Sequence, residues 1–220
     1  GKINNKNKKY IHTVSKAKNV KKVKRKYNRI VKKESYEQKL DRLFTKNAKK
    51  IGVPKYLIKS ICKVESGLRS TSFSKNDGGN NVHAFGLCQV LRSTAEVVSR
   101  KRDYSGCMLD YSSLPRSKRT AKNCILFDMD HNIQIASYYL RDQLRKYSDL
   151  EDAIASYNMG HLRKCKKDGA VKDKQGRVLY RCKRGQRMNQ RYVDKVFDQL
   201  GSEYHKIFGL GKDMEAYVEK

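Results

Sequence analysis

Residues 61–67, Ile-Cys-Lys-Val-Glu-Ser-Gly, end a segment that is apolar over much of its helical surface. Pro54 suits the first turn of a helix because its fixed φ is helical and its missing N–H is not needed there. Gly67 is a typical helix stop. The apolar positions between them are Leu57, Ile58, Ile61, Cys62 and Val64. The stretch therefore predicts a buried helix that carries Glu65 near its C-terminal end.

Apolar spacing predicts further helices on both sides of this segment. Leu40, Leu43, Phe44, Ala48 and Ile51 recur at intervals of three and four, which marks one face of a helix. The same reasoning predicts helices at about 36–51, 93–98, 130–146, 150–157 and 189–208.

Residues 70–84 are polar and hold the turn signal Asp77-Gly78-Gly79-Asn80, so we expect a loop or small hairpin beside Glu65. Residues 178–180 suggest one short strand in a mainly α architecture.

The charge of the chain is high and uneven. The 220 residues carry a net charge of +29, and residues 1–33 contain 14 Lys or Arg and no Asp or Glu. We interpret this stretch as a flexible basic arm, whose Lys and Asn content could also reflect genome composition. A basic surface attracts polyanions such as nucleic acid, anionic lipid or cell-wall polymers.

Length and hydropathy restrict the class of protein. A chain of 220 residues suits one domain with a substantial core. No apolar run is long enough to cross a membrane, and no apolar secretory signal is visible. We expect either that a signal was removed or that the protein leaves the cytoplasm by another route.

Six cysteines bear on the redox compartment: Cys62, Cys88, Cys107, Cys124, Cys165 and Cys182. An even number suits disulfides in an oxidising compartment, although six reduced thiols are the alternative. No Cys-x-x-Cys pair or His-rich cluster indicates a metal site. We expect no metal and no cofactor.

Several short motifs follow one another along the chain. They are Glu65-Ser66, Gly86-Leu87-Cys88-Gln89-Val90, Leu126-Phe127-Asp128 with Asn132-Ile133, Ser156-Tyr157-Asn158-Met159-Gly160, and Arg191-Tyr192-Val193 through Val196. As a set they resemble the lysozyme-like catalytic domain of soluble lytic transglycosylases, relatives of goose-type lysozymes that cleave bacterial peptidoglycan. The resemblance covers about residues 40–205. It departs from the family pattern at Cys88, where Met is usual, and at Met159, where Ala is usual.

The resemblance implies a mainly α, lysozyme-like domain with a small loop or β-hairpin region beside the active site. It divides the chain into a basic arm (1–35), the catalytic domain (36–208) and a C-terminal tail (209–220). Insertions are expected at about 101–124 and 161–187. Each insertion carries two cysteines, so we prefer the pairs Cys107–Cys124 and Cys165–Cys182. Cys62 and Cys88 lie in segments that meet in the family fold, where they either form a bridge or simply pack.

The resemblance also implies roles for individual residues. Glu65 would protonate the glycosidic oxygen between N-acetylmuramic acid and N-acetylglucosamine, and would then take the proton of the muramic C6 hydroxyl as that oxygen attacks C1. The product would be a 1,6-anhydro sugar. A carboxyl group supplies such a proton when an apolar setting disfavours its charged form. The residues expected to line the substrate cleft are Ser66, Gln89, Tyr157, Asn158 and Tyr192.

Alternatives remain open at this point. Asp77 is either a turn residue or a second carboxylate that activates water, which would make the protein a muramidase. His83 is either a metal ligand or, more often for a lone histidine, a polar surface residue. A third possibility is a basic protein on the same fold that binds DNA or the wall. It predicts strongly salt-dependent binding to DNA, but intact Glu65, Gln89 and Asn158 argue against it.

The expected partners are peptidoglycan glycan strands, with anionic wall polymer or DNA contacting residues 1–33 and a virion or envelope-complex protein as a further candidate. Proteins of this family act in wall turnover, in secretion and conjugation machines, and in phage particles. We therefore expect a periplasmic or extracellular site of action, or carriage in a phage particle, which suits a strongly basic chain best.

Overall fold

A computed structural model describes residues 34–75, 82–99, 103–173 and 175–208. Residues 1–33, Asp77 and residues 209–220 lie outside this part, so the predictions for the basic arm, the second carboxylate and the tail are not addressed by it. The chain divides into two compact units, Gly1–Lys39 and Leu40–Lys220. Within the described residues, no helix has both the length and the apolar character needed to cross a membrane.

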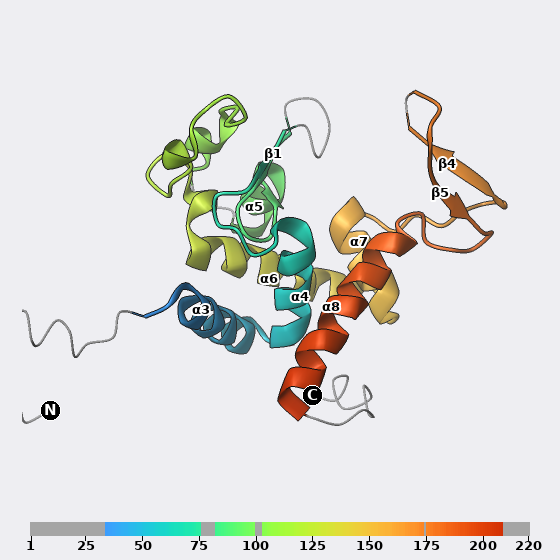
Figure 1. The fold of residues 1–220 in the computed structure, drawn as a ribbon, viewed down its shortest axis with the longest axis horizontal. Coiled ribbons are helices and arrows are strands. Elements are labelled where there is room, and N and C mark those ends of the chain that lie inside the picture. Colours follow the sequence, from blue (N-terminus) through green and yellow to red (C-terminus); the bar gives the residue numbers. More distant parts are fainter. Residues whose placement is uncertain (1–33, 76–81, 100–102, 174, 209–220) are drawn as a thin grey trace, which may run out of the picture. The chain divides into compact units, whose positions relative to one another are not determined.

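The described chain is mainly helical, as predicted (Figure 1). Its α-helices are α3 (Tyr36–Ile51), α4 (Lys55–Ser66), α5 (Arg92–Ser99), α6 (Met129–Lys146), α7 (Leu150–Met159) and α8 (Gln190–Phe208). Three single 3₁₀ turns connect α5 to α6: Ser105–Met108, Arg116–Lys118 and Ile125–Phe127. The helices expected around the Glu65 segment are thus confirmed, with ends that differ from the prediction by one or two residues.

Local side chains explain where several helices begin and end. At the start of α3, the Ser35 hydroxyl accepts from the Gln38 N–H while the Gln38 side chain accepts from the Ser35 N–H, which is a capping box. Asp128 and Asp149 cap α6 and α7 by accepting from backbone N–H groups three residues on. Gly67 ends α4 in the left-handed conformation, with a φ of 65°.

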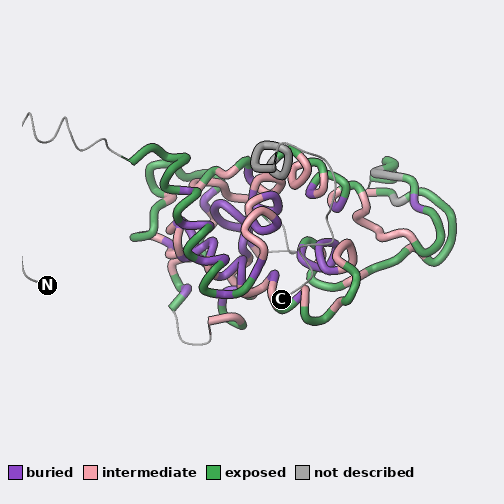
Figure 2. Tube along the Cα trace, turned by 90° about the horizontal axis from the view of Figure 1, so that it is seen from below, coloured by how far each residue is buried: buried purple, intermediate pink, exposed green. Residues whose placement is uncertain are grey.

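Helix α4 lies in the core. Its residues Leu57, Ile58, Ile61 and Cys62 are at most 3% exposed, and the helix packs against α6 and α8. Figure 2 shows the buried positions concentrated in the interior of the helical body. The facing helices contribute buried side chains such as Ile133 of α6 and Val193 of α8. Burial of this kind stabilises by about 25 cal/mol for each Å² of apolar surface, so α4 is a rigid base for Glu65.

A small antiparallel sheet follows α4, with the strand order β1 (Phe73–Ser74), β2 (Ala84–Phe85) and β3 (Val90–Leu91). Pairing of β1 with β2 confirms the hairpin expected at 70–84. Strands β2 and β3 enclose a tight turn that consists of residues 86–89. The motif Gly86-Leu87-Cys88-Gln89 is therefore a hairpin turn, which the sequence alone did not predict.

All six cysteines are paired, as Cys62–Cys88, Cys107–Cys124 and Cys165–Cys182. The two preferred pairs are confirmed, and the question left open for Cys62 and Cys88 is answered by a bridge. The second insertion forms a hairpin of β4 (Gly169–Lys172) and β5 (Val178–Cys182). The strand expected at 178–180 lies within β5.

Candidate active site

Glu65 is the second-last residue of α4. Its side chain is half-buried, and its Oε1 accepts a hydrogen bond of 2.6 Å from the hydroxyl of Tyr192 on α8. The left-handed Gly67 turns the chain away directly afterwards. The carboxyl group therefore stands at the end of a buried helix, held by a donor that comes from 127 residues further along the chain.

Two tyrosines share the surroundings of Glu65. Burial and the neighbouring Glu65 carboxylate raise the pKa of Tyr157 well above its usual value. The same two causes raise the pKa of Tyr192 well above its usual value. Both hydroxyls therefore keep their protons at neutral pH, and Tyr192 stays a hydrogen-bond donor to Glu65.

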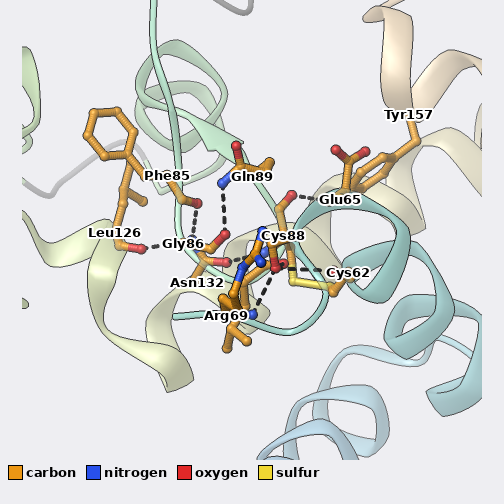
Figure 3. Close-up of a disulfide and its surroundings, with 12 residues drawn as sticks. Cys62, Glu65, Arg69, Phe85, Gly86, Cys88, Gln89, Leu126, Asn132 and Tyr157 are labelled. Carbon is orange, nitrogen blue, oxygen red and sulfur yellow. Dashed lines mark hydrogen bonds between the residues drawn. A yellow bond between two sulfur atoms is a disulfide. The ribbon is translucent and has the colours of Figure 1, made fainter. Parts of the chain in front are cut away.

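Gln89 ends the hairpin turn in a left-handed conformation, with a φ of 47°. Its amide nitrogen donates to the Gly86 carbonyl at 2.9 Å, and its amide oxygen accepts from the Ser74 hydroxyl at 2.5 Å. A non-glycine residue at this φ costs about 1 kcal/mol or more. The hydrogen bonds at both ends of the amide hold the side chain in one orientation on the same side of the turn as Glu65 (Figure 3).

The hairpin turn is attached to α4 at two points, Cys62, three residues before Glu65, and Ser66, the residue after it. Cys62 is bonded to Cys88 (Figure 3), and the Ser66 hydroxyl donates to the Leu87 carbonyl at 2.6 Å. Ser66 is only 4% exposed and lies outside the lining of the cavities beside Glu65. It connects α4 with the turn, whereas the resemblance implied that it lines the cleft.

Asn132 on α6 holds the other side of the same turn. Its amide nitrogen donates to the carbonyls of Phe85 and Leu126, both at 2.8 Å, and its oxygen accepts from the Cys88 N–H at 2.9 Å. A Cβ atom at Gly86, whose φ is 73°, would lie 2.6 Å from the Leu126 oxygen and 2.7 Å from the Asn132 amide nitrogen. Only glycine fits here, because the turn and α6 approach so closely.

A cavity of about 440 Å³ opens beside Glu65. Its lining combines polar groups with apolar and aromatic side chains. The lining residues are Glu65, Gln89, Val90, Leu91, Thr94, Ala136, Tyr139, Tyr157, Asn158, Met159, Gly160 and Arg163. Polar and apolar side chains line this cavity in comparable measure, and amides and tyrosines suit sugar hydroxyl and acetamido groups.

Asn158 is exposed at the end of α7, and its oxygen accepts a 3.1 Å hydrogen bond from Asn189. Asn189 also donates to the Ala155 carbonyl at 3.0 Å. This bond uses one of the two lone pairs of the Asn158 oxygen, which leaves the other lone pair and the amide N–H groups for a ligand. Asn189 precedes α8, where no pattern in the sequence distinguished it.

The structure thus gathers Glu65, Gln89, Tyr157 and Asn158 around one cavity and brings Tyr192 to the acid. Sequence reasoning did not single out Tyr139 on α6 as a site residue. Its ring lies 5.2 Å from that of Tyr157 and also lines the cavity. An inward-facing position and a cavity-lining position share the same helical spacing, so periodicity could not separate them.

Within the described ranges, no group of three or more His, Cys, Asp or Glu side chains could hold a metal ion. His83 is 6% exposed and lies against the Phe73 ring, with 5.2 Å between ring centroids. The expectation of a polar surface position for His83 was therefore wrong, because the aromatic residues beside β2 enclose it.

Comparison with known protein families gives one match. The family described as Transglycosylase SLT domain matches residues 42–179. The matched range runs from α3 to β5, so it contains Glu65, the hairpin turn and the end of α7. Tyr192 on α8 lies beyond it. Comparison with curated proteins gives no match.

Proposed function

The chain belongs to the SLT transglycosylase family, and from this premise we propose that it cleaves peptidoglycan strands with Glu65 as general acid and then general base. The family supports lytic transglycosylase activity on peptidoglycan. The observation that carries the residue assignment is the Glu65 carboxyl group beside a 440 Å³ cavity, hydrogen-bonded to Tyr192 and flanked by Gln89 and Asn158.

In the first step the Glu65 carboxyl group gives its proton to the oxygen that links N-acetylmuramic acid to N-acetylglucosamine. The bond from C1 to that oxygen breaks, and positive charge develops at C1 and the ring oxygen. The Glu65 carboxylate formed in this way lies on the cavity wall, where it stabilises that charge. General acid catalysis of this kind contributes about 10²–10⁴-fold in rate.

In the second step the muramic C6 hydroxyl attacks C1 and gives its proton to the Glu65 carboxylate. The acid is regenerated, the product is a 1,6-anhydromuramic end, and no water is consumed. Tyr192 supports both steps because its hydroxyl fixes one oxygen of Glu65. The Gln89 and Asn158 amides, held by Ser74 and Asn189, would orient the sugars.

Product analysis tests this proposal directly. Purified peptidoglycan is digested with the wild-type chain and with Glu65→Gln, and the products are weighed by mass spectrometry. We expect anhydromuramic products, one water lighter than reducing ends, and their loss in the variant. Ordinary reducing ends in the wild-type digest, in place of anhydromuramic ends, would indicate a muramidase. Asp77→Asn would then test whether Asp77 is the second carboxylate. A wild-type chain that yields no products would refute the enzymatic proposal.

The compartment follows from the substrate and the cysteines. Peptidoglycan lies outside the cytoplasm, and three disulfides fit an oxidising environment. We therefore place the site of action in the periplasm or outside the cell. Carriage in a phage particle, a virion partner and a DNA or wall contact of residues 1–33 stay predictions.

A further inference from the structure

A second cavity, of about 190 Å³, also borders Glu65 and Gln89. It differs in character from the larger cavity, because three of its lining side chains are arginines: Arg69, Arg116 and Arg119. The remaining lining comes from residues 71–74, which include β1. The two cavities share Glu65 and Gln89, so a strand that fills the first cavity reaches the border of the second, where three arginines lie together.

Two of the arginines belong to the first insertion, which the disulfide Cys107–Cys124 closes. Arg119 donates to the Thr71 carbonyl at 3.1 Å and to the Tyr111 carbonyl at 3.0 Å. Its guanidinium lies 5.7 Å from the centre of the Phe73 ring. These contacts fix the insertion against β1 and leave the buried Arg119 Nε–H without an acceptor. Arg119 is therefore an ordered cation with an unused donor.

The charge of this cavity is not balanced by its own lining. Glu65 is the one acid among the described lining residues, and one of its oxygens already accepts from Tyr192. The nearby Asp110 is paired with Lys75 at 2.6 Å. None of the ion pairs seen among the described residues involves Arg69, Arg116 or Arg119. Clustered cations in a concave site attract anions and hold carboxylates well.

We propose that this arginine-lined cavity binds a carboxylate carried by a muramic acid residue near the bond that is cleaved. The inference rests on the proposed function and adds a specificity for charge to it. Along a glycan strand the sugars themselves are neutral, and the carboxylates sit on the lactyl or lactyl-peptide substituent of each muramic acid. The planar fork of arginine matches a carboxylate with two parallel hydrogen bonds.

Arg116 gives the cleanest test because its side chain is exposed and it lies in the 3₁₀ turn Arg116–Lys118. Arg116→Gln removes the charge without opening the core. Lys118→Gln is the matched control, since Lys118 lies in the same turn, is also exposed and is not part of the cavity lining. Both changes are made in the wild-type chain for kinetics and in Glu65→Gln for binding without turnover.

Three soluble strands are compared: native strands, strands whose carboxylates are converted to neutral amides, and strands stripped of peptide by an amidase, which keep only the lactyl carboxylate. We expect Arg116→Gln to weaken binding and raise KM for native strands about 5-fold, as for a partly exposed charged hydrogen bond. Its effect on amidated strands should vanish, and Lys118→Gln should match the parent throughout. In a native strand the lactyl carboxyl is bound in an amide to the peptide, so an effect on native strands assigns a peptide carboxylate. An effect that appears only on stripped strands assigns the lactyl carboxylate, which the amidase sets free.

The two proposals fail in different ways. An active chain in which Arg116→Gln binds native, amidated and stripped strands like the parent would overturn the carboxylate site. Equal losses in Arg116→Gln and Lys118→Gln would do the same, because they would reflect overall charge. An inactive parent whose binding still shows the Arg116 pattern would refute the reaction while supporting the site.

Discussion

At the scale of single residues, the hydrogen bond from Tyr192 to Glu65 is the contact on which the proposed mechanism depends most. In that mechanism it fixes one oxygen of the carboxyl group that gives and then takes the proton. In Tyr192→Phe we expect kcat to fall about 10-fold, because that oxygen is no longer fixed.

Tyr157→Phe is the comparison for that experiment. Its hydroxyl donates to the Cys88 carbonyl at 3.5 Å, so Tyr157→Phe leaves the bond from Tyr192 to Glu65 in place, and we expect it to lower kcat less than Tyr192→Phe does. The pKa of Tyr192 is itself raised by burial and by Glu65, so its own ionisation does not produce a limb of the pH–rate profile near neutral pH. An unchanged kcat in Tyr192→Phe would show that the bond to Glu65 has no part in catalysis.

Gly86 illustrates a residue that is required for two separate reasons. Its φ of 73° disfavours any side chain, and a Cβ atom would lie 2.6 Å from the Leu126 carbonyl oxygen. We expect Gly86→Ala to lower the free energy of unfolding by about 2–4 kcal/mol. Gly52→Ala is the control, because Gly52 has a φ of 77° with nothing within 4 Å. It should cost about 1 kcal/mol, as measured by denaturant unfolding. If Gly86→Ala and Gly52→Ala lowered the free energy of unfolding equally, the Leu126 carbonyl would have moved aside for the new Cβ atom.

At the scale of elements, the hairpin turn of residues 86–89 connects the helix of the acid with the rest of the cleft. The disulfide Cys62–Cys88, the Ser66 hydrogen bond and the Asn132 amide hold the turn from two different helices. Each bond restrains a different atom of a four-residue turn, so Gln89 has little freedom to move. The turn of residues 86–89 therefore holds Gln89 in position, in addition to bordering the cleft.

Arg187, at the end of the second insertion, makes several of the contacts that attach the insertion to the domain, beside the ion pair of Lys164 with Asp152. Arg187 donates to Asp152 at 2.5 Å, to Asp149 at 2.6 Å and to Glu151, all at the N-terminus of α7. Its side chain is only 15% exposed. We expect Arg187→Gln to cost about 2 kcal/mol, because three carboxylates lose their shared cation. Hydrogen exchange should accelerate in residues 161–187.

The stability that Arg187→Gln loses should depend on pH in one direction. A backbone hydrogen bond from Asp152, and then Arg187, lower the pKa of Asp149 below its ordinary value of 3.8. Stabilisation by Arg187 is therefore present above pH 3.8 and is lost as the pH falls through the lowered pKa. The difference between Arg187→Gln and the parent should shrink in acid. Lys167→Gln, an exposed cation of the same insertion, should behave like the parent at every pH.

At the scale of the whole molecule, the sequence predicted best what depends on local spacing. Helix α4 and its partners follow from apolar intervals of three and four, because burial of one face is what makes such a helix stable. Tyr192 could be assigned to the site only through the motif, since its bond to Glu65 spans 127 residues. Arg116 and Arg119 carried no signal at all, because their meeting with Arg69 depends on how an insertion folds back onto β1.

The three disulfides decide how far the folded chain depends on its surroundings. They close sequence separations of 26, 17 and 17 residues. In the chain-entropy account each contributes about 3 kcal/mol, so together they rival the total stability of about 5–15 kcal/mol that is usual for a domain. We expect excess thiol to lower Tm by more than about 20 °C, as measured by circular dichroism with and without reductant.

The three disulfides should differ in how much each contributes to the thermal stability of the domain. Cys62 and Cys88 are both buried, so replacing both by Ser loses the cross-link, disturbs the core and releases the Gln89 turn. Replacing Cys165 and Cys182 should loosen mainly the β4–β5 insertion and leave the main transition within a few degrees. If reduction left Tm and activity unchanged, the bonds would be incidental to stability. If it lowered Tm and abolished activity, the chain would keep its working fold only under oxidising conditions.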